Sequence, residues 1–396
     1  MDKGRGEEGS SKMIEKYTAV AVQTIIRHVR EPEWRDAIIR ENVNRYLSLM
    51  EYVSCRWGQA KLYVLPEFSL TGVEHVRSVE EWTRIALRIP GPELEPLANF
   101  ARINRAYVAG GTMEYDPAYP NRWFNSAYLF GPSGDLVLRY RKINGADVQG
   151  HTTYSTPTGC YDLYVKNEGG EDALFPVVDT EIGRLALINC YDINFPEMPR
   201  AFAQHGAEIL LHCTGEPYGP HREPWEMSRR TRAYENCMYV ISSNHGGYAA
   251  QVSGNVFADS PGLNFQERRD GEISPLHRSH GGSEIVDFNG KVAGAAPNPG
   301  EALAIGPIDL RALRERRAEI RDNILVQSRT EIYAREYTRH QATGINRWLE
   351  APIAHKSEAR QSTEAVIARY LRDGVYAPPE GYEPAAPSEQ QNRALA

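Results

Sequence analysis

Strand-like and helix-like patterns alternate along the first 320 residues of the chain. In the first half, short and nearly continuous apolar runs predict buried strands, and longer amphipathic stretches predict helices. The predicted strands cover residues 17–25, 61–65, 106–115, 123–130 and 135–143, and the predicted helices cover residues 32–55 and 91–105. Residues 131–134 read Gly-Pro-Ser-Gly, which indicates a turn that joins the last two strands as a hairpin.

The second half repeats the pattern. Its predicted strands cover residues 183–189, 208–212 and 239–244, its predicted helices cover 196–205 and 223–237, and a hairpin is predicted over 283–295. Alternating strands and helices predict an α/β architecture, and the hairpins make its sheets mixed. Residues 159–173 are interpreted as an inserted loop and residues 246–282 as a Gly- and Ser-rich segment, and both are expected to shape access to a site.

The end of the chain differs from the rest in composition. A charged helix is predicted over residues 309–321, and the remainder has too few apolar residues to build a second core. We therefore predict a disordered leader (1–13), one domain (14–320), an arm that packs on this or another subunit (321–377), and a disordered tail (378–396).

Composition excludes several classes of function. Apolar residues make up 41% of the 396 residues, but no apolar run approaches the roughly 20 residues that a membrane-spanning helix needs. The N-terminus lacks the hydrophobic segment of a secretory signal. A net charge of −7 argues against a general nucleic-acid binder. The five cysteines show no paired CxxC spacing, which predicts free thiols in a cytoplasmic protein without a metal site.

Three short segments carry candidate chemistry. Glu67 follows the apolar run that ends at Pro66, Lys142 closes an Arg-Tyr-Arg-Lys segment, and Cys190 lies on a predicted turn between a strand and a helix. All three residues fall at the carboxyl ends of predicted strands, where α/β sheets collect their ligands. Taken singly, each has an ordinary structural explanation, and their joint occurrence is what indicates a site.

The three side chains form a consistent hydrolytic set. A lysine cation and a helix N-terminus both favour the thiolate of Cys190. Glu67 can take the thiol proton and return it to a departing amine. Lys142 and the backbone N–H of Tyr191 can stabilise the oxyanion of a tetrahedral intermediate. Tyr191 and His212, which ends the next strand, are candidate substrate contacts.

The segments LPEFSLTG, RYRKI and NCYDINFPE resemble, in this order, the three signature segments of the nitrilase superfamily of carbon–nitrogen hydrolases. The resemblance extends over residues 17–320. It implies a four-layer αββα sandwich with two mixed β-sheets, and a homodimer or higher homo-oligomer. It also implies that no cofactor is used, and that Glu67, Lys142 and Cys190 form a catalytic triad.

The residues after Cys190 indicate a branch of the superfamily. Cys-Tyr-Asp is similar to the amidase and carbamoyl-amide hydrolase branches, whereas true nitrilases usually carry Cys-Trp-Glu. We therefore predict an amidohydrolase that forms a Cys thioester on a small-molecule amide and releases ammonia or an amine. In carbamoyl-D-amino-acid hydrolases, arginines bind the substrate carboxylate at the positions where this chain has Ile193 and Asn194. This difference argues against that substrate class. An N-carbamoyl-amide hydrolase and an acyl transferase remain alternatives.

One feature departs from the resemblance. Many members of the superfamily carry a second glutamate soon after the lysine, but here the next one is Glu168. Asp147, Gln149 and His151 are the candidates to replace it, and of these we predict Asp147 as a site residue. The missing glutamate also leaves open a non-catalytic assembly or binding protein of the same fold. The intact triad argues against that alternative, because a scaffold has no need for all three residues.

Overall fold

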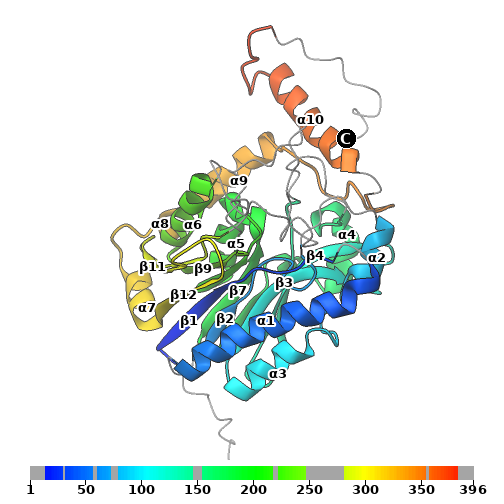
Figure 1. Cartoon of the computed structure of the whole chain (residues 1–396). Helices are drawn as coiled ribbons and strands as arrows, with labels where there is room; N and C mark the ends of the chain where they lie inside the picture. Colours follow the sequence, from blue (N-terminus) through cyan, green and yellow to red (C-terminus); the bar gives the residue numbers. More distant parts are fainter. Residues whose placement is uncertain are drawn as a thin grey trace, which may run out of the picture.

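The computed structural model describes residues 14–29, 32–56, 60–72, 79–145, 154–216, 222–246, 281–353 and 356–381. Two six-stranded sheets pack face to face in its centre, with helices on both outer faces (Figure 1). The predicted four-layer αββα sandwich with two mixed sheets is therefore confirmed.

The first sheet has the strand order β12-β1-β2-β3-β4-β5. The strands β1, β2 and β3 run parallel, whereas β12 and the β3–β4–β5 meander are antiparallel. Its strands are β1 (Lys16–Gln23), β2 (Leu62–Val64), β3 (Tyr107–Tyr115), β4 (Trp123–Phe130), β5 (Leu136–Arg141) and β12 (Ala302–Asp309).

The second sheet has the order β11-β10-β9-β8-β7-β6, with β7, β8 and β9 parallel and the outer pairs antiparallel. Its strands are β6 (Val177–Thr180), β7 (Gly183–Asn189), β8 (Ile209–Cys213), β9 (Tyr239–Ser243), β10 (Glu284–Val286) and β11 (Val292–Ala295). The carboxyl ends of β7, β8 and β9 therefore meet at one edge, which prepares a site there.

Side-chain alternation explains how each sheet joins two layers. In β1, Ala19 and Ala21 belong to the core between the sheets, whereas Val20 and Val22 belong to the core under the outer helices. Helix α1 (Arg35–Arg56) covers this outer face with buried residues spaced three and four apart, the period of one helix face. These residues are Ile39, Val43, Tyr46, Met50 and Val53.

The remaining helices complete the layers. Helix α3 (Glu95–Asn104) lies with α1 against the first sheet, and α5 (Glu197–Gln204) and α6 (Arg222–Asn236) cover the second sheet. The others are α2 (Val79–Ile85), α4 (Tyr161–Glu168), α7 (Leu310–Ala318), α8 (Ile324–Gln327), α9 (Thr330–Arg339) and α10 (Lys356–Arg372). Among the described helices, none combines the length and apolar character needed to cross a bilayer.

Several elements differ from the sequence prediction, among them β6, α2, α9 and α10, which were not predicted. The loop predicted over 159–173 is wrong, because α4 forms within it and ends at Gly169 in the left-handed conformation. Tyr164 anchors this helix beside the rings of Tyr119 and Phe124. Strand β12 was not predicted, although it pairs with β1 along its whole length.

The arm after residue 320 contacts its own domain at several points, and the contacts of residues 346–348 lie nearest to the Lys142 segment. The backbone N–H groups of Asn346 and Trp348 donate to the carbonyls of Thr158 (2.9 Å) and Gly159 (2.7 Å). Gly159 suits this contact, because a Cβ there would lie 2.8 Å from the Trp348 ring. Residues 346–348 are therefore tied to the segment that follows the Lys142 strand.

Other parts of the arm expose apolar side chains. Helix α9 buries none of its residues and leaves Ile332, Tyr333 and Tyr337 at least half exposed. We expect a chain truncated after residue 321 to give a lower mass in light scattering than the full chain, because this face is available to a second copy. Replacing Ile332 and Tyr333 with serine in the full chain should have the same effect. An unchanged mass in both cases would contradict an intersubunit role for the arm.

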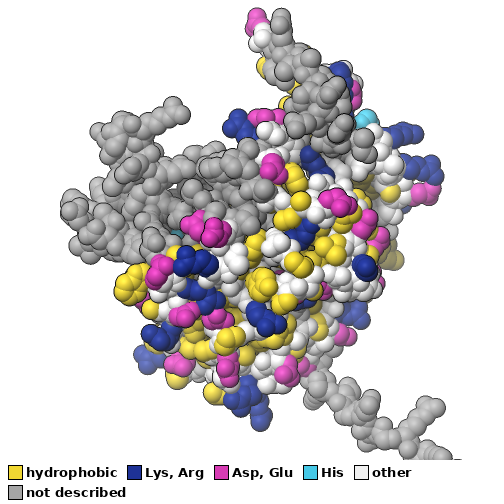
Figure 2. All heavy atoms as spheres, turned by 90° about the vertical axis from the view of Figure 1, so that its right-hand side faces the viewer, with side chains coloured by type: hydrophobic (Ala, Val, Ile, Leu, Met, Phe, Trp, Pro, Cys, Tyr) yellow, Lys and Arg dark blue, Asp and Glu magenta, His cyan; other side chains and the backbone are white. Residues whose placement is uncertain are grey.

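Figure 2 shows the face of the molecule that lies to the right in Figure 1. Among the described residues on this face, basic and acidic side chains are interspersed with hydrophobic ones. This mixture agrees with the small excess of acidic over basic residues in the chain, 52 against 45.

Candidate functional site

Two of the three predicted catalytic side chains form a direct ion pair. Lys142 follows β5 and Glu67 lies three residues after β2, and the distance from Lys142 Nζ to Glu67 Oε1 is 2.8 Å. Both side chains are almost completely buried. Cys190 follows β7 and interacts electrostatically with both groups. The structure therefore brings Glu67, Lys142 and Cys190 together from three different strand ends.

The carboxylate of Glu67 is held from a second side. Asn125 in β4 donates its side-chain amide to Glu67 Oε1 at 2.6 Å, and its own oxygen accepts from Asn189 at 3.0 Å. Gly111 of β3 lets the backbone of Glu67 lie close to this strand, because a Cβ at position 111 would lie 2.8 Å from the Glu67 Cα. Asn125 was not predicted from the sequence. The available signal was an amide in a largely apolar strand, where a buried polar group needs a partner.

Cys190 has a backbone conformation that is unusual for a residue other than glycine. Its φ is +46°, and it begins the short 3-10 helix η4 (Cys190–Asn194) directly after β7. Left-handed conformations of such residues cost roughly 1 kcal/mol or more and concentrate at functional sites. The residue is buried, with 8% of its surface exposed.

Electrostatics keeps this thiol protonated at rest. Burial and the neighbouring Glu67 carboxylate raise the pKa of Cys190 to about 12, against the lowering effect of Lys142 and the Gly215 N–H. Lys142 therefore acts in the predicted direction but is outweighed by burial. A buried thiol of this kind needs a base at the moment of attack, and Glu67 is the adjacent carboxylate.

Lys142 remains a cation in this setting. Burial alone would lower its pKa, but the neighbouring Cys190 and the Glu67 carboxylate raise it well above the ordinary value. A fixed positive charge beside Cys190 is suited to stabilising a developing oxyanion in a water-poor site.

Asp192 joins the Lys142 segment to the Cys190 segment. Its carboxylate accepts hydrogen bonds from the Tyr140 hydroxyl (2.6 Å), the Asn144 N–H (2.8 Å), the Asn144 side chain (3.0 Å) and the Ile143 N–H (3.3 Å). Burial raises the pKa of this fully buried group to about 6, against the lowering effect of Lys142. Asp192 thus fixes the chain directly after Lys142. This role was not predicted from the sequence.

We expect Asp192→Asn to lower kcat by about tenfold, because an NH2 group then faces donors that need an acceptor. Wild-type kcat should fall as the pH drops below about 6, where Asp192 is protonated. This acid limb should be absent in the variant, and Asp179→Asn, at an exposed carboxylate, should keep it.

Unfolding should not explain that acid limb. The folded pKa of Asp192 lies above its ordinary value of 3.8, so its contribution to stability decreases as the pH rises from about 4 to about 6. Acid therefore strengthens this contribution while activity falls. An identical acid limb in the variant and the wild type would contradict the assignment.

Tyr191, His212 and Asp147 were also predicted as site residues, and their surroundings in the structure differ. The Tyr191 ring is half-buried and packs between Phe195 (5.3 Å between ring centroids) and Trp225 (6.2 Å). His212 is fully buried, and both of its ring nitrogens contact protein groups rather than an open space. Asp147, like its alternatives at positions 149 and 151, lies outside the described residues.

A buried ion cluster adjoins Cys190. Arg229 of α6 pairs with Glu216, after β8, and with Glu284 of β10 (3.1 Å). Arg229 is fully buried and also donates to the Gly282 carbonyl at 3.0 Å. Glu216 contributes to the raised pKa of Cys190. The cluster therefore fixes the end of β8 beside the site.

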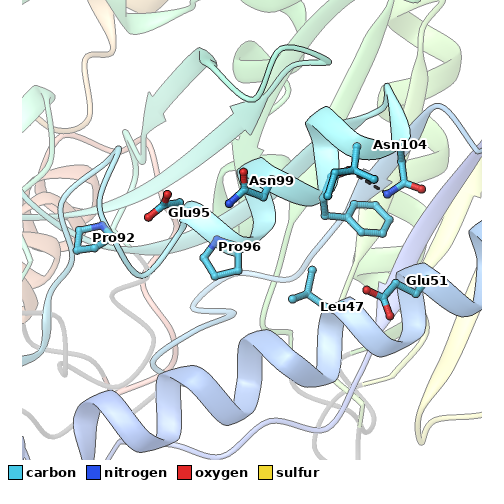
Figure 3. A pocket seen from close by; sticks show the side chains of 9 residues that line it. Leu47, Glu51, Pro92, Glu95, Pro96, Asn99 and Asn104 are labelled. Atoms are coloured by element: carbon cyan, nitrogen blue, oxygen red, sulfur yellow. Dashed lines mark hydrogen bonds between the residues drawn. The ribbon is translucent and has the colours of Figure 1, made fainter.

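A separate groove lies between α1 and α3 (Figure 3). It has a volume of about 470 Å³, and its lining includes Glu51 of α1 and Glu95 and Asn99 of α3. These helices cover the outer face of the first sheet, whereas Cys190 directly follows β7 of the second sheet. The groove contains neither a nucleophile nor a cation, so we do not assign the catalytic chemistry to it.

Known proteins resemble this chain in sequence and in fold. A family model described as carbon-nitrogen hydrolase matches residues 22–318. The chain is 29% identical over 306 residues to omega-amidase NIT2 of Homo sapiens, which covers 76% of this chain and 94% of that protein. It is 27% identical over 244 residues to a formamidase of Bacillus thuringiensis (strain Al Hakam), covering 61% and 67%. A solved carbon-nitrogen hydrolase of Helicobacter pylori G27 shares the fold, with a TM-score of 0.58 at 19% identity, over 81% of this chain and 98% of that one.

Proposed function

Because this chain belongs to the carbon–nitrogen hydrolase family, we propose that it hydrolyses the carbon–nitrogen bond of a small amide through a thioester on Cys190. The relatives named omega-amidase and formamidase support amide hydrolysis in general. The observation that carries the mechanism is the buried Lys142–Glu67 pair beside a protonated thiol.

The first half of the reaction forms the acyl-enzyme. Cys190 Sγ attacks the amide carbonyl carbon while its proton passes to Glu67. The Lys142 ammonium and the backbone N–H of Tyr191 stabilise the oxyanion of the tetrahedral intermediate. Collapse of this intermediate breaks the C–N bond, and Glu67 returns the proton to the departing nitrogen, so that ammonia or an amine leaves.

The second half releases the acid. A water molecule gives a proton to Glu67 and attacks the thioester carbon. Collapse of this second intermediate breaks the C–S bond, and the proton on Glu67 restores the Cys190 thiol. The sum is one amide and one water converted to one carboxylic acid and one ammonia or amine, without a cofactor.

Substrate class is tested by ammonia release from a panel of simple amides, N-carbamoyl compounds and nitriles, with Cys190→Ala as control. Release from simple amides alone, lost in the control, is the expected result. Release from N-carbamoyl compounds would assign the carbamoyl-amide hydrolase instead. No release from any member, together with slow alkylation of Cys190, would favour a non-catalytic protein of this fold.

We also propose that the protein is a homo-oligomer that works in the cytoplasm. The exposed apolar side chains of α9 support the first proposal, and the cysteine usage of the sequence supports the second.

A further inference from the structure

The backbone carbonyl of Cys190 has a partner outside the usual strand ladder. The residue leaves β7 with φ +46°, and its carbonyl is buried with it. A buried carbonyl needs a donor. His212 Nε2 supplies the contact at 3.0 Å, from the neighbouring strand β8.

The His212 ring is fixed at its other end as well. Its Nδ1 lies 2.8 Å from the hydroxyl of Ser242 in β9, and both side chains are fully buried. The strand register explains this arrangement, because Ile188 of β7, His212 of β8 and Ser242 of β9 lie directly opposite one another. The hydrogen-bonded chain from Ser242 through His212 to the Cys190 carbonyl therefore crosses the second sheet from β9 to the end of β7.

The chemistry of the contacts determines where the ring carries its proton. A carbonyl oxygen only accepts, so Nε2 must be the protonated nitrogen. Burial and the nearby Arg229 lower the pKa of His212 to about 3, so the ring is neutral at ordinary pH. The unprotonated Nδ1 then accepts a hydrogen bond from the Ser242 hydroxyl.

The contacts and the low pKa of His212 exclude two other roles for its side chain, a substrate contact and a general base. Both ring nitrogens are occupied by protein groups, which leaves His212 no polar atom for a substrate. A neutral ring with so low a pKa is also a poor base near pH 7.

We propose that His212 is a positioning residue: its Nε2–H holds the Cys190 carbonyl, and Ser242 keeps the ring in the tautomer that can do so. The hydrogen bond stabilises the left-handed conformation that keeps Sγ beside Lys142, Glu67 and the Gly215 N–H. The effect on turnover rests on the proposed function, whereas the effect on thiol reactivity does not.

The test measures the rate at which iodoacetamide alkylates Cys190, followed by mass spectrometry of its peptide, together with kcat and KM. His212→Leu should lower the alkylation rate and kcat by about 10- to 100-fold with KM unchanged, the size expected for one lost buried hydrogen bond. His212→Gln can still place an N–H near the Cys190 carbonyl and should stay within about fivefold of wild type. The exposed Cys55 is an internal reference, and His205→Leu is a matched surface control.

The variant Ser242→Ala provides a second test. It should slow alkylation about three- to tenfold when His212 is present, because the ring can then adopt the wrong tautomer, and should have no effect beside His212→Gln. Equal effects of Ser242→Ala in both backgrounds, or a wild-type alkylation rate in His212→Leu, would overturn the proposal. A raised KM with unchanged kcat in His212→Leu would also overturn it and indicate a substrate contact. If no amide is hydrolysed, the alkylation rates still decide the role of His212, and only the proposed function fails.

Discussion

Replacing Cys190 with alanine is expected to abolish turnover, with kcat lowered by at least about 10⁴-fold, as for other covalent nucleophiles. The variant loses the thiol that forms the acyl-enzyme, and its two neighbours cannot replace it, because Lys142 is held as a cation and the carboxylate of Glu67 is engaged by two donors. Its fold should persist, because alanine fits the space of the thiol.

The measurement is ammonia release at saturating amide, with circular dichroism to confirm folding. Cys237→Ala is the matched control, because Cys237 follows α6 and lies outside the site. It should keep kcat within about twofold of wild type. Turnover at more than a tenth of the wild-type rate in the Cys190 variant would contradict the assignment of the nucleophile.

Replacing Lys142 with methionine should have the second-largest effect. Methionine keeps most of the length but removes the charge that faces the oxyanion, and loss of one such group costs about 10²- to 10³-fold in kcat. The change also leaves Glu67 buried without its cation, a penalty of about 3–5 kcal/mol for a broken buried pair. The melting temperature should therefore fall together with kcat.

A double variant separates these two effects. Lys142→Met combined with Glu67→Gln no longer carries an unpaired charge, so it should recover most of the lost stability without recovering activity. Lys166→Met, at an exposed position of α4, is the matched control and should change neither quantity. A stable and active Lys142→Met variant would contradict the proposed role of the cation.

Much of the fold could be predicted from the sequence because its strands are short apolar runs with clear ends. The run at 123–130 coincides with β4, and the run at 183–189 coincides with β7. Strand β12 was missed because Gly306 and Pro307 interrupt its apolar pattern. Its stability comes from pairing with β1, which is nearly 300 residues away along the chain.

The proposed catalytic residues were predicted from three segments, but the groups that hold them in place were not. Asp192 reads as part of a turn, and its role depends on backbone N–H groups almost 50 residues earlier. Asn125 reads as one amide within a strand, and only the sheet packing shows that it meets Glu67. Such contacts depend on distances between strands that the sequence pattern does not encode.

For His212, the sequence predicted the position in the sheet but not the contacts of the side chain. Its place at the end of a strand predicts a substrate contact, because strand ends face the site. The register of β8 and β9 instead directs its ring to Ser242 and to the Cys190 carbonyl. Position in the sheet was predictable, whereas the direction of the side chain required the structure.

The acyl-enzyme itself is the most direct test of the proposed mechanism. Wild-type protein mixed with a hydrolysed amide, quenched in acid within its first turnovers, should gain the mass of one acyl group in place of one hydrogen. Digestion should locate that mass on the peptide that contains Cys190, and Cys190→Ala should show no gain. An adduct on another residue, or an adduct in the alanine variant, would contradict the mechanism.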